Sequence, residues 1–371
     1  MRIAIDCRMK YGVGTILKNV VPRIAATVDH VVLIGDPNDM SRWDFTTHNV
    51  SLVEFKHPVY SWKEQVFFPR HAVAGVDIYH CPHFNIPLRD VGKAKLVVTI
   101  NDLAHLSGIL PISKLQRIYA KFFLHESVRR SVELITLSNF SRSEIEKEIP
   151  ASHPKVNVIG CAVDRVIFSP YAEKHAPPLP FLSDKIAFIL TSGSLRPHKN
   201  LNSLLDAFVI LKEKYGIPHK LVIAGQSKGF RLNSGVLKLP KDVDRDVIYT
   251  GFVTETQLAY LYSRCEAFVF PSLYEGFGLP PLEAMACGAP VITSDRASLP
   301  EVLGGAGILV DPLDFLEMAR SIYSVVTDHS LAADLKRRSL ERANFFSWDD
   351  VAKKYLEVYK QALKRAKGTN T

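Results

Sequence analysis

The sequence has few cysteines, no long apolar run and no leader-like beginning. Its five cysteines are widely spaced, odd in number and without a Cys-x-x-Cys pair, which argues against a disulfide framework or a structural zinc site. No apolar run approaches the roughly 20 residues that a membrane-spanning helix needs. Met1 leads directly into an apolar stretch, without a charged and then apolar leader. We therefore expect a cytoplasmic protein whose cysteines are reduced and mostly buried.

Length and charge narrow the class of protein further. A chain of 371 residues exceeds what one hydrophobic core usually serves, so two domains are expected. The formal net charge of +8 suits a nucleic acid, an anionic membrane surface or a phosphorylated substrate. The basic clusters lie in helix-like stretches, where a solvated face is the common explanation, and the chain lacks zinc-finger spacing, an RRM-like signature and a basic region joined to heptads. We expect no nucleic-acid partner.

Strand-like apolar runs alternate with helix-like patterns along both halves of the chain. In the first half the runs lie at residues 3–5, 31–34, 50–55, 77–80, 96–100, 134–137 and 156–159. In the second half they lie at residues 186–191, 220–224, 247–249, 267–270, 290–293 and 308–310. Helical spacing of apolar residues occurs at 15–26 and 115–128. This alternation predicts an α/β protein with two mostly parallel, doubly wound, Rossmann-like sheets.

A proline-rich break separates the two halves. Pro177, Pro178 and Pro180 interrupt any regular structure there. We place an N-terminal domain at 1–170 and a C-terminal domain at 181–346, and we expect a helix at 349–366 to pack back on the first domain. Two sheets joined by one linker predict a cleft, and ligands of such sheets bind beyond the carboxyl ends of the strands.

The segment 270–286 reads as a strand end, a glycine turn and a helix start. Gly276 and Gly278 allow the backbone to approach a ligand closely, and Pro280 or Pro281 suits a first helical turn. A helix start presents free amides and the positive end of the helix dipole. The segment therefore suits a diphosphate or a cluster of sugar hydroxyls.

Two glutamates flank this turn. Glu283, expected in the first helical turn, can accept both hydrogen bonds of a ribose diol, and Glu275 can face a sugar. Two glutamates eight residues apart are common in proteins, so the turn between them is what favours a functional role. The arrangement resembles the E-x7-E motif of retaining glycosyltransferases of family four, or glycosyl transferases group 1. That resemblance implies a GT-B fold, with two Rossmann-like domains facing each other across a cleft, the second of which binds the donor.

The resemblance extends to residues 192–201, which look like the phosphate-binding segment of that family. It implies that Lys199 and Arg196 hold the donor diphosphate, where a cation is needed because the leaving nucleoside diphosphate gains negative charge. His198 stands where many members have arginine. The catalytic residues implied are Glu275, Lys199 and Arg196. The donor-binding residues implied are Glu283, Gly276, Phe277, Gly278, Leu279, Gly14 and His198.

A second glycine-rich segment lies near the beginning of the chain. Gly12 and Gly14 resemble the family's glycine loop before the first helix, near donor phosphates and acceptor. A dinucleotide fingerprint is the rival interpretation, because Asp36 follows Gly14 at a suitable distance. Leu17 occupies the position of the third glycine of that fingerprint, and Gly12 comes several residues after the strand. Both features argue against the fingerprint, and an NAD-dependent enzyme is only the third hypothesis.

Further segments of the first domain resemble parts of the family that face the acceptor. The acceptor or sugar pocket implied is formed by Gly12, His83, Asn101, Asp102 and His105. Asn101 stands where the family usually has a histidine beside the transferred sugar, and His105 is a candidate substitute. Because of Asn101, a nucleotide-sugar-binding protein of the same fold without turnover is the second hypothesis.

A metal site of the Asp-x-Asp form is the last alternative. Asp242, Asp244 and Asp246 have this spacing, but they follow Pro240 rather than a buried strand, so we expect a solvated loop and a metal-independent enzyme without cofactor.

Segments around Lys199 resemble bacterial mannosyltransferases. The hypothesis is therefore retaining transfer of mannose from GDP-mannose to a saccharide or lipid-linked saccharide in polysaccharide biosynthesis, with UDP-glucose or another donor left open. A lipid-linked acceptor would add peripheral contact with the inner surface of an anionic membrane.

Overall fold

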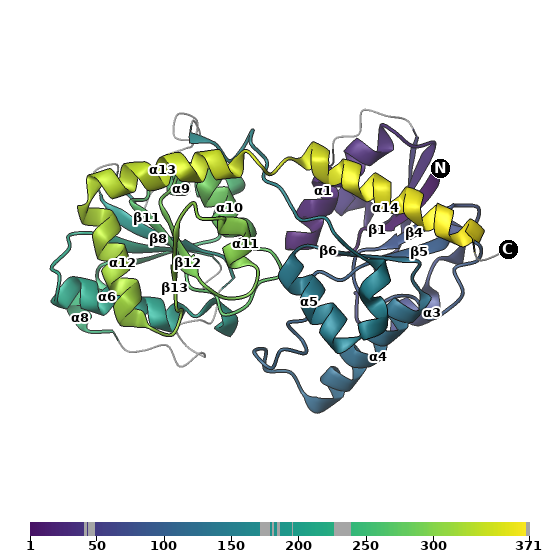
Figure 1. Ribbon diagram of the computed structural model, residues 1–371, viewed down its shortest axis with the longest axis horizontal. Coiled ribbons are helices and arrows are strands. Elements are labelled where there is room, and N and C mark those ends of the chain that lie inside the picture. The colour runs from purple at the N-terminus through teal and green to yellow at the C-terminus, as the bar shows by residue number, and fades with distance from the viewer. Residues whose placement is uncertain are drawn as a thin grey trace. The chain divides into compact units, whose positions relative to one another are not determined.

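A computed structural model describes residues 1–40, 43, 49–170, 179, 182–183, 186–194, 196–225 and 239–368, without the side chains at 11 and 366–368. The chain forms two compact units, one made of Met1–Cys161 with Ser347–Thr371 and the other of Ala162–Phe346 (Figure 1). The proline-rich break predicted at 176–180 lies, apart from residue 179, outside the described residues.

Within its described residues, the first unit holds a seven-stranded parallel sheet in the order β3-β2-β1-β4-β5-β6-β7. The strands are β1 Arg2–Asp6, β2 His30–Gly35, β3 Val50–Glu54, β4 Ile78–Cys81, β5 Lys95–Thr99, β6 Glu133–Thr136 and β7 Val156–Val158. Burial is nearly complete along the central strands because helices cover both faces of the sheet. Each predicted strand of this half is confirmed.

The second unit, in the part that is described, holds a six-stranded parallel sheet in the order β10-β9-β8-β11-β12-β13. Its strands are β8 Phe188–Ser192, β9 Lys220–Ala224, β10 Val247–Gly251, β11 Ala267–Phe270, β12 Val291–Ser294 and β13 Ile308–Val310. These match the six apolar runs of the second half. The predicted pair of doubly wound sheets is therefore confirmed.

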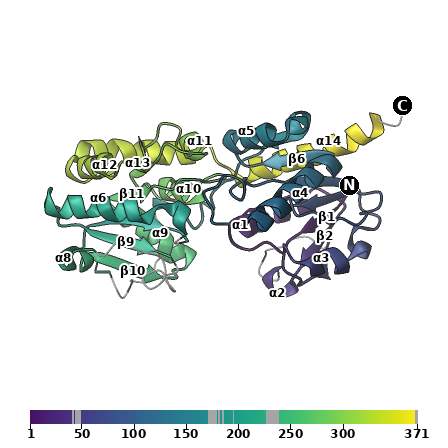
Figure 2. The ribbon, with the colours of Figure 1, turned by 90° about the horizontal axis from the view of Figure 1, so that it is seen from below.

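Helices flank both sheets (Figure 2). Those of the first unit are α1 Tyr11–Ala25, α2 Pro37–Met40, α3 Trp62–Phe67, α4 Lys114–Arg130, α5 Asn139–Glu148 and α14 Trp348–Gly368, with short 3-10 segments η1 Arg70–Val73 and η2 Pro150–Lys155. Those of the second unit are η4 Pro197–Lys199, α6 Leu201–Glu213, α8 Lys241–Asp244, α9 Glu255–Arg264, α10 Leu279–Ala286, α11 Leu299–Leu303, α12 Phe315–Thr327 and α13 His329–Ala343. No helix among these described residues is both long enough and apolar enough to cross a bilayer.

The last helix belongs to the first unit although it ends the chain. α14 packs beside α1, where Arg23 Nε donates to Asp349 Oδ1 at 2.7 Å. Its Tyr355 and Tyr359 are buried, and the Tyr359 hydroxyl lies 2.9 Å from Nδ1 of the buried His80 on β4. These contacts anchor the helix to the sheet near the carboxyl half of β4.

Two local predictions are wrong. Gly12 and Gly14 do not form a loop before the first helix, because α1 begins at Tyr11 and contains both. A Cβ atom at Gly14 would lie 3.0 Å from the carbonyl oxygen of Met9, so glycine there permits close approach of the preceding chain. Asp242 and Asp244 lie on the short helix α8 rather than in a loop, and both are exposed.

Both sheets have a point at which the direction of chain order reverses. In the first unit it lies between β1 and β4, and in the second between β8 and β11. The connections leaving two such neighbouring strands run to opposite sides of the sheet, so the carboxyl ends of the strands border an open crevice. Candidate functional side chains are therefore expected just after β1, β4, β8 and β11.

Candidate active site

A lysine and a glutamate meet at the reversal point of the second sheet. Lys199 follows β8 in η4, Glu275 lies in the loop after β11, and Lys199 Nζ is 2.5 Å from Glu275 Oε1. Their side chains are only 17% and 14% exposed. Lys199 Nζ also lies 4.8 Å from the centre of the Phe270 ring, so a cation is held at the carboxyl end of β11 by an ion pair and an aromatic face.

The turn after β8 depends on backbone conformations that few residues adopt. Gly193 has φ +125°, and Asn200, which directly precedes α6, has φ +54°. Gly225, after β9, lies against the same turn: a Cβ atom there would sit 2.1 Å from the carbonyl oxygen of Gly193. Glycine at position 225 is therefore what lets the two strand ends approach.

Hydroxyl groups from neighbouring elements hold the loop that carries Glu275. Ser298 Oγ donates to the carbonyl oxygens of Glu275 at 2.9 Å and Phe277 at 2.6 Å. Ser294 Oγ donates to the carbonyl oxygen of Ser272 at 2.6 Å. Both serines are fully buried, so these bonds fix the path of the loop in a place that water does not reach.

Replacing Ser298 with alanine is expected to destabilise the second unit by about 1–3 kcal/mol, because two buried carbonyl oxygens would lose a donor. The midpoint of urea unfolding, compared with that of the native chain, measures this change. Ser324→Ala is the control, because this exposed serine donates to the Arg320 carbonyl oxygen of its own helix, α12, and it should change stability by less than about 0.5 kcal/mol. Equal midpoints for both variants would contradict the proposed bracing of the loop.

Helix α10 begins at Leu279, where the sequence predicted its start. Gly278 caps it with φ +113°, and Pro280 and Pro281 occupy the first turn as predicted. Glu283 is the fifth residue of α10 and not part of the first turn, so that prediction is wrong. Glycine is needed at the N-cap, because a Cβ atom at Gly278 would lie 2.7 Å from Leu299 Cδ2 of α11.

Glu283 lies at the end of a buried hydroxyl chain. The Tyr262 hydroxyl, on α9, is 3.3 Å from Glu283 Oε2 and 2.7 Å from Ser192 Oγ at the end of β8. Burial raises the pKa of Glu283 to about 7, although the bond from Tyr262 opposes that shift. The carboxyl group is thus poised between its neutral and charged forms near neutral pH.

The remaining donor-side residues surround these groups. Arg196 is exposed just before η4. The His198 carbonyl oxygen accepts from the Leu273 amide at 2.7 Å, which ties η4 to the loop after β11. Burial, reinforced by Lys199, lowers the pKa of His198, so its imidazole is neutral near pH 7. Phe277 is buried against Phe346, with ring centres 6.0 Å apart.

At the reversal point of the first sheet the structure places a buried charged network. Arg8, after β1, lies 2.6 Å from Asp6 Oδ2 and 2.9 Å from Glu64 Oε2, and His83 Nε2 lies 3.4 Å from Asp6 Oδ2. Burial alone would raise the pKa of Asp6, but Arg8 and His83 hold it well below its usual range. Burial likewise opposes a charged His83, yet Cys81 and Asp6 raise its pKa to about 10.

This network bears on two predictions. His83 was expected to face an acceptor, but its side chain is 2% exposed and is engaged inside the unit. Asp6, Cys81 and His83 also place potential metal-ligand atoms within 4.8 Å of one another. Arg8 already neutralises Asp6 there, and a guanidinium at this distance repels a metal cation. The group is therefore better explained as an ion-pair network that supports the strand ends.

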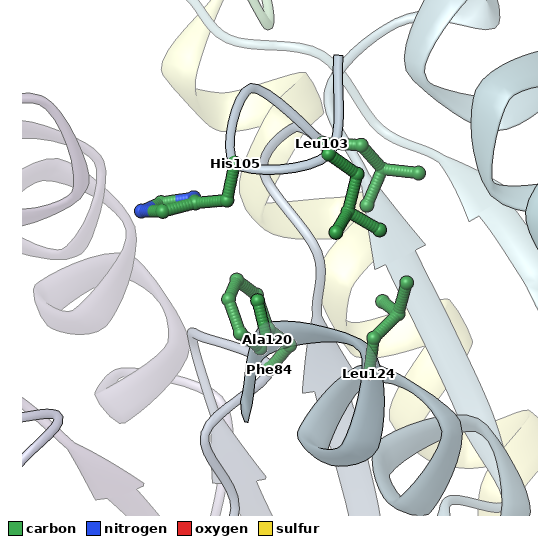
Figure 3. Close-up of a pocket in the computed structure, with 6 residues that line it drawn as sticks. Phe84, Leu103, His105, Ala120 and Leu124 are labelled. Carbon is green, nitrogen blue, oxygen red and sulfur yellow. The ribbon is translucent and has the colours of Figure 1, made fainter. Parts of the chain in front are cut away.

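The other predicted acceptor residues lie after β5. Asn101 Nδ2 donates to the Pro82 carbonyl oxygen at 3.0 Å, and Asp102 Oδ1 accepts from the Ala104 amide at 2.9 Å. The His105 ring packs edge-on to Phe84, with centres 5.8 Å apart, and both residues line an apolar pocket (Figure 3). The pocket is lined by Phe84, Leu103, His105, Leu106, Ala120 and Leu124.

Two buried polar atoms near this segment are unsatisfied within the described part of the chain. They are Asn101 Oδ1 and His105 Nδ1. Buried polar atoms are usually paired, so atoms without a partner after a strand end are where a ligand hydroxyl would gain most. Asn101 and His105 therefore both offer such an atom in the segment after β5, whereas Gly12 lies exposed on α1, in a different element.

Sequence reasoning missed several residues that support the candidate site. Tyr262 and Ser298 hold Glu283 and the Glu275 loop, and Arg8 and Glu64 form the buried network of the first unit. Ser298 begins the run Ser298-Leu299-Pro300-Glu301-Val302, which resembles the closing segment of the family's donor domain, and this resemblance was the one signal available. Nothing in the spacing indicates the contact between Arg8 and Glu64 or that between Tyr262 and Glu283, because these partners are far apart in the chain.

Comparisons with known proteins agree with this architecture. The profile of the family Glycosyl transferases group 1 matches residues 178–342. O-antigen chain mannosyltransferase B of Escherichia coli is 34% identical over 291 residues, which cover 76% of this chain and 74% of that protein. Serotype-specific mannosyltransferase WbdA of Escherichia coli is 35% identical over 186 residues, which cover 49% of this chain but only 23% of that longer protein.

Solved structures extend the likeness to the whole fold. Sucrose-phosphate synthase from Thermosynechococcus elongatus superposes with a TM-score of 0.78 over 97% of this chain and 98% of that chain, at 20% sequence identity. At this identity the match concerns the fold alone, which is the predicted GT-B fold. Together with the family profile and the 34% identical relative, it shows that the chain belongs to the glycosyl transferases group 1, enzymes that take a sugar from a nucleotide-activated donor.

Proposed function

We propose that this glycosyltransferase moves mannose from GDP-mannose to a saccharide or lipid-linked saccharide during polysaccharide biosynthesis, with retention of anomeric configuration. The choice of mannose is supported by the mannosyltransferases among its relatives. The observation that carries the assignment of the site is the contact between Lys199 and Glu275 at the carboxyl ends of β8 and β11. No metal ion or other cofactor is part of the proposal.

The donor side of the reaction is assigned to the domain at 181–346. Lys199 and Arg196 would neutralise the diphosphate, and the start of α10 at Leu279 would offer it free amides. Glu283, as a carboxylate, would accept from the two ribose hydroxyls. Glu275 would orient the sugar and hold Lys199 in place before the donor arrives. Support for this division comes from the ion pair and from the hydroxyl chain that reaches Glu283.

We infer a transfer step without a protein nucleophile. The acceptor hydroxyl oxygen would attack the anomeric carbon on the face that the diphosphate leaves, and the bond to the phosphate oxygen would break. The hydroxyl proton would pass to the departing phosphate oxygen. Lys199 would stabilise the charge that develops there, which is a contribution realised mainly in the transition state.

The acceptor side is assigned to the domain at 1–170. Asn101 and His105 are proposed to contact the sugar or acceptor through their unsatisfied buried atoms, with Asp102 fixing the segment between them. His83 would act indirectly, through Asp6, and Gly12 would lie at the edge of the region. A lipid-linked acceptor would bring this domain to an anionic membrane at its cytoplasmic face.

A screen of nucleotide sugars tests the proposed function. The purified chain is incubated with GDP-mannose, UDP-glucose or other donors and with saccharide acceptors, and products are identified by mass spectrometry. Addition of one hexose from GDP-mannose alone is the expected result. Transfer from UDP-glucose alone would overturn the donor, and tight GDP binding without release of product from any donor and acceptor would favour a binding protein. Stabilisation by NAD but not GDP in thermal unfolding would contradict the donor site altogether.

A further inference from the structure

Tyr60, just before α3, has a backbone conformation that is rare for a tyrosine. Its φ is +69°, in the left-handed region that glycine adopts readily and bulky residues avoid. Among the described residues, the other positions that combine a positive φ with a side chain are Asn200 and Ala297, whose side chains are small. Strained residues of this kind cluster at ligand sites, where the strain is kept because the side chain has a role. The position of the Tyr60 ring therefore needs a functional explanation.

The buried charged network of the first unit holds Tyr60 in this conformation. The Tyr60 amide donates to Glu64 Oε1 at 2.9 Å, and Glu64 Oε2 lies 2.9 Å from Arg8 Nη1. Arg8 Nη1 also donates to the His57 carbonyl oxygen at 3.0 Å. Residues 57 and 60 are thus bonded to two side chains that are only 6% and 2% exposed. Such bonds are what a strained backbone needs in order to persist.

The Tyr60 ring lies beside a cluster of rings that follow β4 and β5. Its centre is 6.3 Å from that of His83, 5.8 Å from that of Phe84 and 6.2 Å from that of His105. His83 and Phe84 are buried, whereas Tyr60 remains 43% exposed. One part of the Tyr60 side chain therefore packs on the cluster, and another part is open to a ligand.

Unsatisfied polar atoms accompany this open aromatic surface. His105 Nδ1 and Asn101 Oδ1 are buried and have no partner within the described part of the chain. Asn101 is tied to the segment that carries the ring cluster, because its Nδ2 donates to the Pro82 carbonyl oxygen. An aromatic surface beside polar atoms matches a pyranose ring, which has an apolar face of C–H groups and a rim of hydroxyls.

The charges near Tyr60 favour a neutral ligand over a phosphate. Arg8 and His83 are both paired with Asp6, at 2.6 Å and 3.4 Å. Burial, reinforced by the negative charge of Asp102, raises the pKa of Tyr60, so its phenol is neutral. A phosphate would meet a negative charge and cations that are already paired, whereas sugar hydroxyls can bond without adding charge.

We propose that Tyr60 is a stacking platform for a pyranose ring of the acceptor, whose hydroxyls bond to His105 Nδ1 and Asn101 Oδ1. The inference rests on the proposed function, because it takes the saccharide acceptor from it. A ring fixed by its backbone presents its surface before the ligand arrives, so little conformational freedom is lost on binding. A lipid chain is disfavoured, because it would leave the two polar atoms unpaired.

Nuclear magnetic resonance of sugar probes with the purified full chain tests the proposal. The probes are methyl α-mannopyranoside, methyl β-glucopyranoside and methyl β-galactopyranoside, each with and without GDP. With the native chain, at least one probe should receive saturation mainly on the C–H groups of one ring face, and the ring current should shift these protons upfield.

Variants at position 60 separate the ring from the hydroxyl and from the backbone. Tyr60→Phe keeps the ring and should keep both signals. Tyr60→Gly removes the ring at a φ that glycine adopts without strain, and it should raise the Kd of the probe by about tenfold or more. Asparagine also tolerates this φ, so Tyr60→Asn should give the same loss. Native circular dichroism and a cooperative thermal transition show that each variant folds.

A control and three further outcomes distinguish this platform from the proposed function. Tyr323→Ala changes a half-buried tyrosine of α12 that stacks on Tyr215, with ring centres 4.4 Å apart, and should bind the probe like the native chain. A native chain that binds GDP but none of the three probes would overturn the platform alone. Equal losses in Tyr60→Phe and Tyr60→Gly would also overturn it, because the hydroxyl would then be the contact. Probe binding without GDP binding would leave the platform standing and remove the proposed function.

Discussion

Replacing Lys199 with alanine is expected to lower kcat for mannosyl transfer by about 10²–10³-fold, the usual loss when one group that stabilises developing negative charge is removed. Lys199 is held by Glu275 at 2.5 Å and by the face of Phe270. A cation fixed in this way needs no reorganisation when the diphosphate begins to leave. The initial rate of GDP release at saturating donor and acceptor measures the effect.

A matched control distinguishes a local role from a general loss of stability. Lys212 is another lysine in a partly buried ion pair: its Nζ lies 2.6 Å from Asp246 Oδ2, and its side chain is 16% exposed. Asp246 directly precedes β10, so this pair lies at the opposite edge of the sheet from the candidate site. Lys212→Ala should keep kcat within about threefold of the native value while destabilising the fold. A Lys199→Ala enzyme with equally little loss would contradict the assigned role.

The strands of both sheets could be read from the sequence because each is a short, nearly continuous apolar run. Such runs are typical of parallel strands buried on both faces. Residues 3–5 and 267–270, for example, are all apolar. Alternation with helical spacing then fixed the class of fold. The reversal points that position the site did not follow from the pattern, since strand order depends on which strands pair and not on their composition.

Helix boundaries were less predictable where glycine and proline lie close together. Gly12 and Gly14 suggested a loop before the first helix, but α1 already contains both. Glycine at position 14 makes room for the Met9 carbonyl oxygen and does not form a loop. Pro280 and Pro281 did indicate the first turn of α10 correctly, but Glu283, expected in that turn, is the fifth residue of the helix. Local propensity does not decide such cases, because the packing of the preceding loop does.

Side-chain partners far apart in the chain were beyond sequence reasoning. Glu283 could be singled out from its motif, but the motif carries no sign of Tyr262, which reaches it from α9, or of the desolvation that shifts its pKa. His83 shows the converse. Its segment resembled an acceptor contact, yet pairing with Asp6 in the interior engages its imidazole. Only the folded chain shows which partners each of these groups has.

Replacing Glu283 with glutamine is expected to raise the Kd for GDP about 10–100-fold at pH 8, because hydrogen bonds to a charged group contribute about 1.5–3 kcal/mol each. The amide keeps one acceptor oxygen and the shape of the side chain, so the loss reports charge rather than packing. Isothermal titration calorimetry measures the Kd. Glu266→Gln is the control, because Glu266 pairs with His219 at 2.8 Å before β11, at the other edge of the sheet.

The pH dependence of the same titration gives the sharper test. With its pKa raised to about 7, Glu283 is mostly protonated at pH 6 and charged at pH 8 in the free protein. If the ribose binds the carboxylate, affinity rises over this interval and binding releases a proton, which calorimetry in buffers of different ionisation enthalpy detects. The Glu283→Gln variant should keep only the pH dependence of affinity that comes from ionisation of the GDP phosphate.

The stability of the free protein should change with pH in the opposite direction. A carboxyl group whose pKa is raised on folding favours the folded state most below its ordinary pKa of 4.5, and that contribution is lost as pH rises through about 7. The native chain should therefore lose thermal stability relative to Glu283→Gln between about pH 6 and pH 8, while it gains affinity for GDP. Parallel pH profiles for the two proteins in both measurements would show that Glu283 is neither desolvated nor the ribose contact.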